Sequence, residues 1–181
     1  MRKSFNSLAE FYLLSDGEKL DSKIDEIVRS LDLKKLGKVL TCHFLLTTYA
    51  VKSWIREVEN KLGLSINLRI VKEESVPYMK ENGLLCFSKK DIGRKERIFM
   101  LSAHETAHFI LMKDGEYEAI KRINEEYLQT SAERANMLSP IEYCANLITL
   151  KVLDGAKNTI KNPKRRDIAL QIIYSLKKQL T

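Results

Sequence analysis

The pentapeptide at 104–108 is an HExxH motif, and it holds two of the chain's three histidines. Residues four apart lie on one face of an α-helix, so His104 and His108 can direct both imidazoles at one zinc ion. Glu105 follows His104 by about 100° around the helix, beside the open coordination position. There it can take a proton from a water molecule and serve as the catalytic base. These residue types at this spacing are typical of zinc-dependent peptidases.

The alternative for this motif is an ordinary core helix with two satisfied histidines. The mostly apolar residues at 98–103 and 109–112 suit a buried helix in either case. Because two of only three histidines fall in this motif and its flanks suit a buried helix, the pattern favours the metal site. His43 stands alone in a mostly apolar segment, and we interpret it as a packed or surface histidine.

A catalytic zinc site usually has three protein ligands and a water molecule, so a third ligand must come from outside the pentapeptide. The chain lacks the HExxHxxGxxH extension, because Leu111 stands where that pattern requires glycine. A carboxylate further along the chain is therefore the better candidate. The candidates are Asp114, Glu116, Glu118, Glu125, Glu126, Glu133 and Glu142.

Glu142 is distinguished by its surroundings, because Asn146 follows it one helical turn later. If this helix packs across the motif helix, Glu142 can reach the metal and Asn146 can hold a ligand imidazole by a hydrogen bond. The alternative is structural, because residues 139–142 form a capping box in which Glu142 needs no metal. Residues 130–133 have the same form, so spacing alone leaves Glu133 open as the runner-up.

The elements that position these residues follow from hydrophobic periodicity. Residues 65–70 alternate between polar and apolar, which predicts a half-buried strand. The run at 84–87, after an Asn-Gly turn signal at 82–83, predicts a second strand. Gly37 is predicted to end the second helix. Helices are predicted at 4–15, 18–36, 39–61, 95–112, 116–128, 139–153 and 163–180.

Composition limits the class of protein. A chain of 181 residues suggests one domain. It contains no run of 18 apolar residues and no signal-peptide pattern, so we expect no membrane span and no membrane partner. The three cysteines are widely spaced and form no CxxC pair. This usage predicts a reducing, cytoplasmic environment.

Charge is concentrated at the end of the chain. Residues 155–181 hold seven basic residues against one acid, which is +6 of the net charge of +7. We interpret this run as the solvated face of a basic helix. Contact with nucleic acid through this helix is the alternative.

The motif and the later helix together resemble the ImmA/IrrE family of metallopeptidases over roughly residues 64–154. The family's Ala-His-Glu-x-x-His sequence is matched at 103–108, and its Glu-x-x-Ala-Asn sequence at 142–146. The chain departs from the family at three places. Ile148-Thr149 replaces a Phe-Ala pair, Asp154 replaces a frequent proline, and Cys144 replaces a frequent second glutamate.

The resemblance implies an α+β fold with a zincin-like metallopeptidase core, mostly helical with a small β-sheet. The expected segments are an N-terminal helical segment at 1–62, the core at 63–154 and a basic C-terminal helix packed on the core at 155–181. The resemblance also implies that His104, His108 and Glu142 bind zinc, with Glu105 as the general base. The implied substrate is a helix-turn-helix transcriptional repressor of a mobile element or a stress response.

Two other functions remain open at this point. A zinc-binding regulator could bind a repressor or another protein without cutting it, although such a module has no need for Glu105. A nucleic-acid-binding protein could instead use the basic C-terminal helix. The sequence does not identify the group that stabilises the oxyanion; the candidates are Tyr78, Tyr117, Tyr127 and Tyr143.

Overall fold

The computed structural model describes residues 17–43, 47–71, 78–88, 98–113, 118, 122 and 140–180. The predicted helix at 4–15 lies outside these residues, as does nearly all of the predicted helix at 116–128. The elements are α2 Gly17–Ser30, α3 Leu33–His43, α4 Thr47–Leu62, β1 Asn67–Val71, β2 Tyr78–Met79, β3 Leu84–Ser88, α6 Ile98–Lys113, α8 Pro140–Ala156, the 3-10 helix η1 Lys157–Thr159 and α9 Pro163–Leu180. This confirms the expectation of a mostly helical α+β fold with a small sheet.

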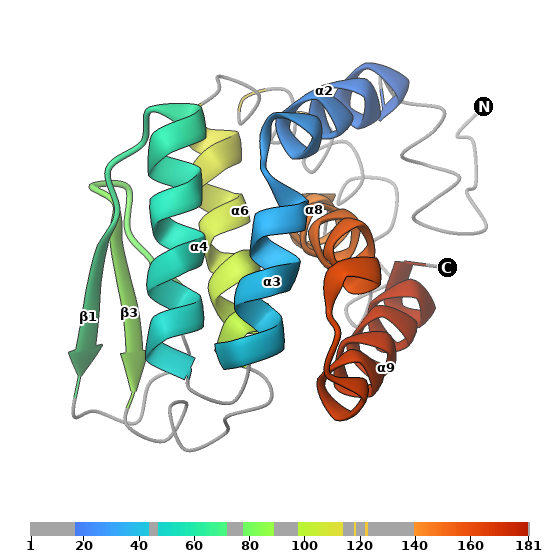
Figure 1. Cartoon of the computed structure of the whole chain (residues 1–181). Helices are drawn as coiled ribbons and strands as arrows, with labels where there is room; N and C mark the ends of the chain where they lie inside the picture. Colours follow the sequence, from blue (N-terminus) through green and yellow to red (C-terminus); the bar gives the residue numbers. More distant parts are fainter. Residues whose placement is uncertain are drawn as a thin grey trace.

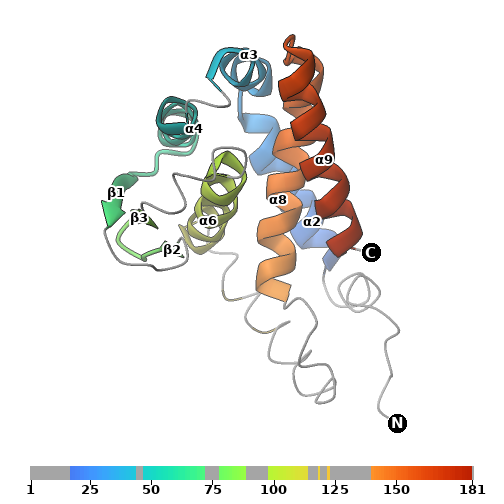
Figure 2. The same ribbon diagram turned by 90° about the horizontal axis from the view of Figure 1, so that it is seen from below.

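The elements form successive layers (Figure 1). The sheet lies at one side, and α4 and α6 lie next to it. Helices α3 and α8 come next, and α9 lies at the side opposite the sheet. Figure 2 shows α8 between α6 and α9, and α8 contacts both. Helix α8 therefore joins the motif helix to the C-terminal helix.

The sheet has the order β1-β3-β2, with β1 parallel and β2 antiparallel to β3. Leu85 pairs with both Leu68 and Met79, and these three side chains pack against the hydrophobic core. Strand β2 was not predicted, because two residues are too few to show alternation. The predicted turn does precede β3, and Gly83 adopts a φ of 82° there. A Cβ at Gly83 would lie 2.2 Å from the carbonyl oxygen of Ser65, so only glycine fits.

Helix α6 is buried around most of its circumference, as expected of a helix that is apolar on nearly all sides. Phe99 makes an edge-to-face contact with Trp54 of α4, with ring centroids 6.1 Å apart. The half-buried positions include His104, Glu105 and His108. None of the described helices combines the length and the apolar character needed to cross a membrane. The other elements cover most of helix α6, and the side of the helix that carries His104, Glu105 and His108 is only partly covered.

One hydrophobic cluster spans the three segments predicted from the sequence. It includes Ile24 and Trp54 from the N-terminal helices, Ile148 from α8 and Ile173 from α9. A polar contact adds to this packing, because Lys151 of α8 forms ion pairs with Asp21 and Asp25 of α2. The N-terminal and C-terminal helices therefore share the core that holds the motif helix.

The predicted single helix at 18–36 is wrong, because the chain divides there into α2 and α3. Asp32 caps the second helix by accepting a hydrogen bond from the backbone N–H of Lys35. The N–H of Asp32 donates to the carboxylate of the buried Glu57 in α4. The apolar stripe continues across this break, so periodicity does not reveal it. The predicted end at Gly37 is also wrong, because Gly37 lies within α3.

Gly37 lies in α3 because α3 passes close to the end of α8. A Cβ at this position would lie 1.8 Å from Oγ1 of Thr159 and 2.5 Å from the carbonyl oxygen of Ala156. Gly37→Ala is therefore expected to lower the free energy of unfolding by about 1–3 kcal/mol, although alanine favours helix. Urea denaturation of the two proteins would measure this difference.

Gly155→Ala in α8 is the matched control. A Cβ at Gly155 would meet mainly the mobile end of the Leu33 side chain, which can shift. This variant is expected to change the free energy of unfolding by less than about 1 kcal/mol. A Gly37→Ala protein as stable as the Gly155→Ala protein would contradict the close approach of α3 to α8.

Candidate metal centre

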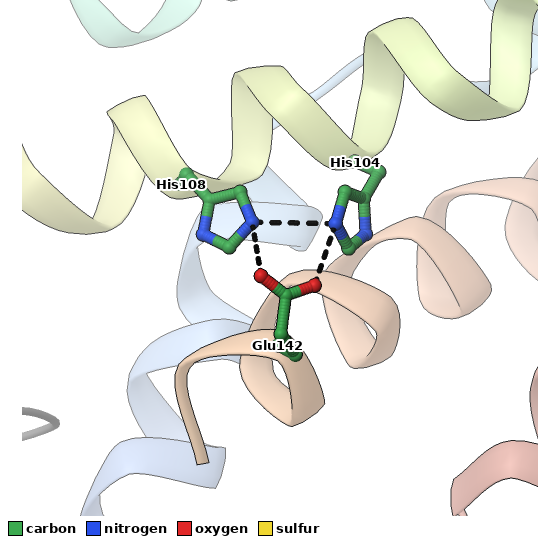
Figure 3. Close-up of side chains that lie close together, drawn as sticks. All are labelled: His104, His108 and Glu142. Carbon is green, nitrogen blue, oxygen red and sulfur yellow. Dashed lines mark hydrogen bonds and ion pairs between the residues drawn. The ribbon is translucent and has the colours of Figure 1, made fainter. Parts of the chain in front are cut away.

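Three side chains from two helices meet at one point (Figure 3). His104 and His108 project from α6 toward α8, and Glu142 in the first turn of α8 points toward them. The Nε2 atoms of the two imidazoles lie 3.2 Å apart. The Glu142 oxygens lie 3.0 Å from Nε2 of His104 and 3.4 Å from Nε2 of His108. This group could hold a metal ion, because its ligand atoms all lie within 4.8 Å of one another.

The spacing of these atoms suits a tetrahedral ion of the size of zinc. Zinc binds imidazole nitrogen and carboxylate oxygen at about 2.0–2.2 Å, so two ligand atoms of a tetrahedral site lie about 3.3–3.6 Å apart. The two Nε2 atoms here are 3.2 Å apart, and each lies near a different oxygen of Glu142, at 3.0 Å and 3.4 Å, so the separations are close to the tetrahedral ones or slightly shorter. Two imidazoles and one carboxylate also form one of the ligand sets found in catalytic zinc sites. The residues present therefore fit a zinc ion.

The charges of the site favour a cation between these groups. Hydrogen bonds from His104 and His108 hold the pKa of the Glu142 carboxyl far below its usual range. Burial lowers the pKa of His104, but the hydrogen bond and the negative charge of Glu142 outweigh it, so the pKa is raised overall. The side chains of both histidines are less than one-fifth exposed. A carboxylate that stays charged beside two shielded imidazoles is the environment that a divalent cation requires.

Polar residues of α8 and α9 lie behind His104. The side chain of Asn146, one turn beyond Glu142 in α8, is among the groups that raise the pKa of His104. The amide nitrogen of Asn146 also donates to Oε1 of Gln179 near the end of α9, at 3.5 Å. Such contacts orient ligand imidazoles in metal sites. The second link was not predicted from the sequence, because Asn146 and Gln179 belong to different helices.

Glu105 lies beside the two histidines on α6. Burial raises the pKa of its carboxyl, while the positive charges of His104 and His108 act in the opposite direction. A backbone hydrogen bond from Met79 in β2 also lowers this pKa. The short strand β2 therefore lies next to the site, because its backbone acts on the charge of Glu105 and the strand contacts α6. A half-buried carboxyl with a raised pKa is suited to exchange protons near neutral pH.

A groove of about 1000 Å³ opens beside the centre, and His104 and Glu142 line it. Its apolar lining consists of Met100, Leu101, Ile168, Ile172 and Leu176. Its further polar lining consists of Asn146, Lys164, Asp167, Gln171, Ser175 and Gln179. Most of these residues belong to α9, whose part in the site was not predicted. The spacing of three and four between these residues along 164–179 indicates that they share one side of a helix. The same spacing is typical of an ordinary solvated helix face, so it did not reveal the groove.

The remaining candidates lie elsewhere or outside the described residues. Among the other carboxylates, Glu118 is described and exposed, and it does not belong to the group. Tyr143 lies close enough to Asp21 and Lys151 for their charges to act on its pKa, which burial raises. His43 ends α3, and its side chain lies outside the described part. The candidates outside the described residues are Asp114, Glu116, Tyr117, Glu125, Glu126, Tyr127 and Glu133.

Tyr78 is directed away from the face of the sheet that packs on the core. Successive side chains of a strand point to opposite faces, and the neighbouring Met79 packs against the core. The ring of Tyr78 lies 5.9 Å from the ammonium group of Lys80. The strand geometry thus does not favour Tyr78 as the group that stabilises an oxyanion.

Comparisons of the chain with protein-family models, with curated proteins and with solved structures found no match.

Removal of the Glu142 charge is expected to weaken metal binding. Glu142→Gln should lower the affinity for zinc by more than about tenfold, because an amide replaces the one negatively charged ligand. Titration with zinc against a competing chelator would measure the affinity. Glu26→Gln is the control, because the Glu26 side chain is 74% exposed on α2. Unchanged affinity in Glu142→Gln would contradict the role of Glu142 as a ligand.

The raised pKa of His104 can be tested in protein stripped of metal by a chelator. We expect His104 to titrate above 6.5 and its pKa to fall in Glu142→Gln, where burial is opposed by fewer interactions. Because the folded-state pKa is the higher one, the stabilisation is complete below pH 6.5 and is lost as the pH rises through that pKa. NMR of the imidazole signals would follow the titration. A pKa that is equal in both proteins would contradict the contact.

Proposed function

We propose that this chain is a zinc-dependent endopeptidase with a zincin-like core. The convergence of His104, His108 and Glu142 on one point carries the proposal, because these ligand atoms lie close enough together to share one metal ion. Glu105 follows the first ligand on the same helix, as the HExxH mechanism requires. A site built only to hold a structural ion would have no use for a half-buried carboxyl with a raised pKa beside its ligands.

The side chains divide the work between them. His104, His108 and Glu142 would hold the ion, and Asn146 would keep the imidazole of His104 in place. Zinc, when bound, supplies Lewis acidity, which acidifies water and polarises a carbonyl group. An open fourth position would remain for water or substrate, as in catalytic zinc sites.

Glu105 would move the proton in the reaction. Its carboxylate would accept a proton from the attacking water and later deliver it to the leaving amine of the cleaved peptide bond. Burial favours this exchange, because it raises the pKa of Glu105 toward neutrality. The hydrogen bond from Met79 would hold the carboxylate in position during both transfers.

The resemblance to the ImmA/IrrE family supports a protein substrate, which we propose to be a helix-turn-helix transcriptional repressor. We further propose that the enzyme acts in the cytoplasm. All three cysteines are free, and two of them, Cys86 and Cys144, are buried. Free thiols of this kind are usual in reducing compartments.

Glu105→Gln is expected to retain zinc and to lower the cleavage rate by about 10²–10⁴-fold, because the amide cannot accept the proton. The measurement is cleavage of a purified helix-turn-helix repressor encoded beside the gene, with zinc content determined on the same samples. Glu26→Gln is again the control and should cleave at the rate of the unmodified protein.

The same experiment separates the proposal from its rival. Cleavage that a chelator abolishes and zinc restores supports the peptidase. Full cleavage by Glu105→Gln would contradict the role of Glu105. A stable complex with the repressor, with no cut in the presence of zinc, would support a non-catalytic regulator instead.

A further inference from the structure

The groove beside the metal centre offers more room than the ion needs. Its volume of about 1000 Å³ lies at the upper end of the range of about 300–1000 Å³ found for small-molecule sites. It begins at His104 and Glu142 and continues along α9 as far as Lys164. The space is therefore continuous with the centre where the proposed reaction takes place.

The groove side of α9 carries two rows of residues. Ile168, Ile172 and Leu176 recur every four residues and form an apolar row. Ile168 and Ile172 remain only half-buried, whereas Ala169, Ile173 and Leu176 are the buried residues of α9 that belong to the core. The predicted apolar stripe of α9 therefore lines the groove and also packs in the core. Apolar side chains that stay half-exposed beside a metal centre are suited to contact a ligand.

The second row on α9 is polar but carries little charge. Gln171, Ser175 and Gln179 line the groove with groups that can both donate and accept hydrogen bonds. Lys164 and Asp167 lie at the far end and have opposite charges. An extended peptide presents a backbone N–H and C=O at each residue, and such groups match amides and hydroxyls better than fixed charges. The lining thus fits a peptide backbone with uncharged side chains.

From these observations we propose that the groove lined by α6, α8 and α9 binds an extended, apolar segment of the peptide substrate, with α9 as the wall that selects it. The inference rests on the proposed peptidase function. Apolar side chains of the substrate would contact Met100, Ile168 and Ile172, and its backbone would bond to Gln171 and Ser175. Helix α9 would then determine which peptide segments the enzyme binds, and its basic residues would contribute less to this choice than its apolar and uncharged polar residues.

Two hydroxamates that chelate zinc separate the groove from the ion. Acetohydroxamate has no side chain and reports the metal centre alone, whereas leucyl-leucine hydroxamate also reaches the groove. The zinc-loaded chain is expected to bind the second probe at least about tenfold more tightly, because burial of a leucine side chain contributes this much. Isothermal titration calorimetry would measure both affinities.

Variants on α9 then locate the gain. Ile172→Asp should remove about tenfold of the affinity for leucyl-leucine hydroxamate and leave that for acetohydroxamate unchanged. Leu170→Asp is the matched control on the same helix, because Leu170 is 43% exposed and does not line the groove. Gln171→Ala should lower the affinity for leucyl-leucine hydroxamate by about threefold to tenfold. Because Gln171 is exposed, this variant tests the groove without the risk to folding that Ile172→Asp carries.

Each outcome decides a different point. A gain that is lost in Ile172→Asp and Gln171→Ala but kept in Leu170→Asp supports the groove. Binding of acetohydroxamate without any gain from the leucines, or a gain that persists in both groove variants, overturns the groove and leaves the metal centre intact. If the chain binds neither zinc nor acetohydroxamate, the proposed function is overturned, and the inference that rests on it also fails.

Discussion

The packing of α6 against α8 is the constraint on which the site depends. The Nε2 atoms of two imidazoles and the oxygens of a carboxylate converge on one half-buried point, with separations of 3.0–3.4 Å. Such polar groups are costly to bury unless a proton or a cation lies between them. A turn of α6 about its axis would place the motif residues in the core, because α6 is apolar on most of its other sides. The core therefore maintains the geometry of the ligands.

The other elements serve this pair of helices. Trp54 of α4 packs on Phe99 of α6, and Lys151 ties α8 to α2. The backbone of the edge strand β2 lowers the pKa of Glu105, and Gln179 of α9 accepts a hydrogen bond from Asn146, which acts on His104. Sites held on helices and strands keep their geometry more closely than sites held on loops. The N- and C-terminal helices are thus part of the structure of the site, although the resemblance to a known family did not extend to them.

Much of the arrangement could be predicted where the signal is local. The strand at β3, the motif helix and the helices at 140–156 and 163–180 follow from periodicity and turn residues. The prediction failed where a distant contact decided the outcome. Asp32 interrupts a continuous apolar stripe because its side chain caps α3 and its N–H bonds to Glu57. Gly37 remains helical because α3 passes close to Thr159 and Ala156.

By itself, the sequence determined that His104, Glu105 and His108 share a helix, since a spacing of one turn is a local property of the chain. It also determined that Glu142 and Asn146 lie one turn apart. It could not determine which carboxylate joins the histidines, because a capping box explains Glu142 equally well. Only the tertiary structure brought Glu142 to both imidazoles and placed α9 along the groove. Contacts between residues far apart in the chain depend on how whole helices pack, and no local pattern encodes that packing.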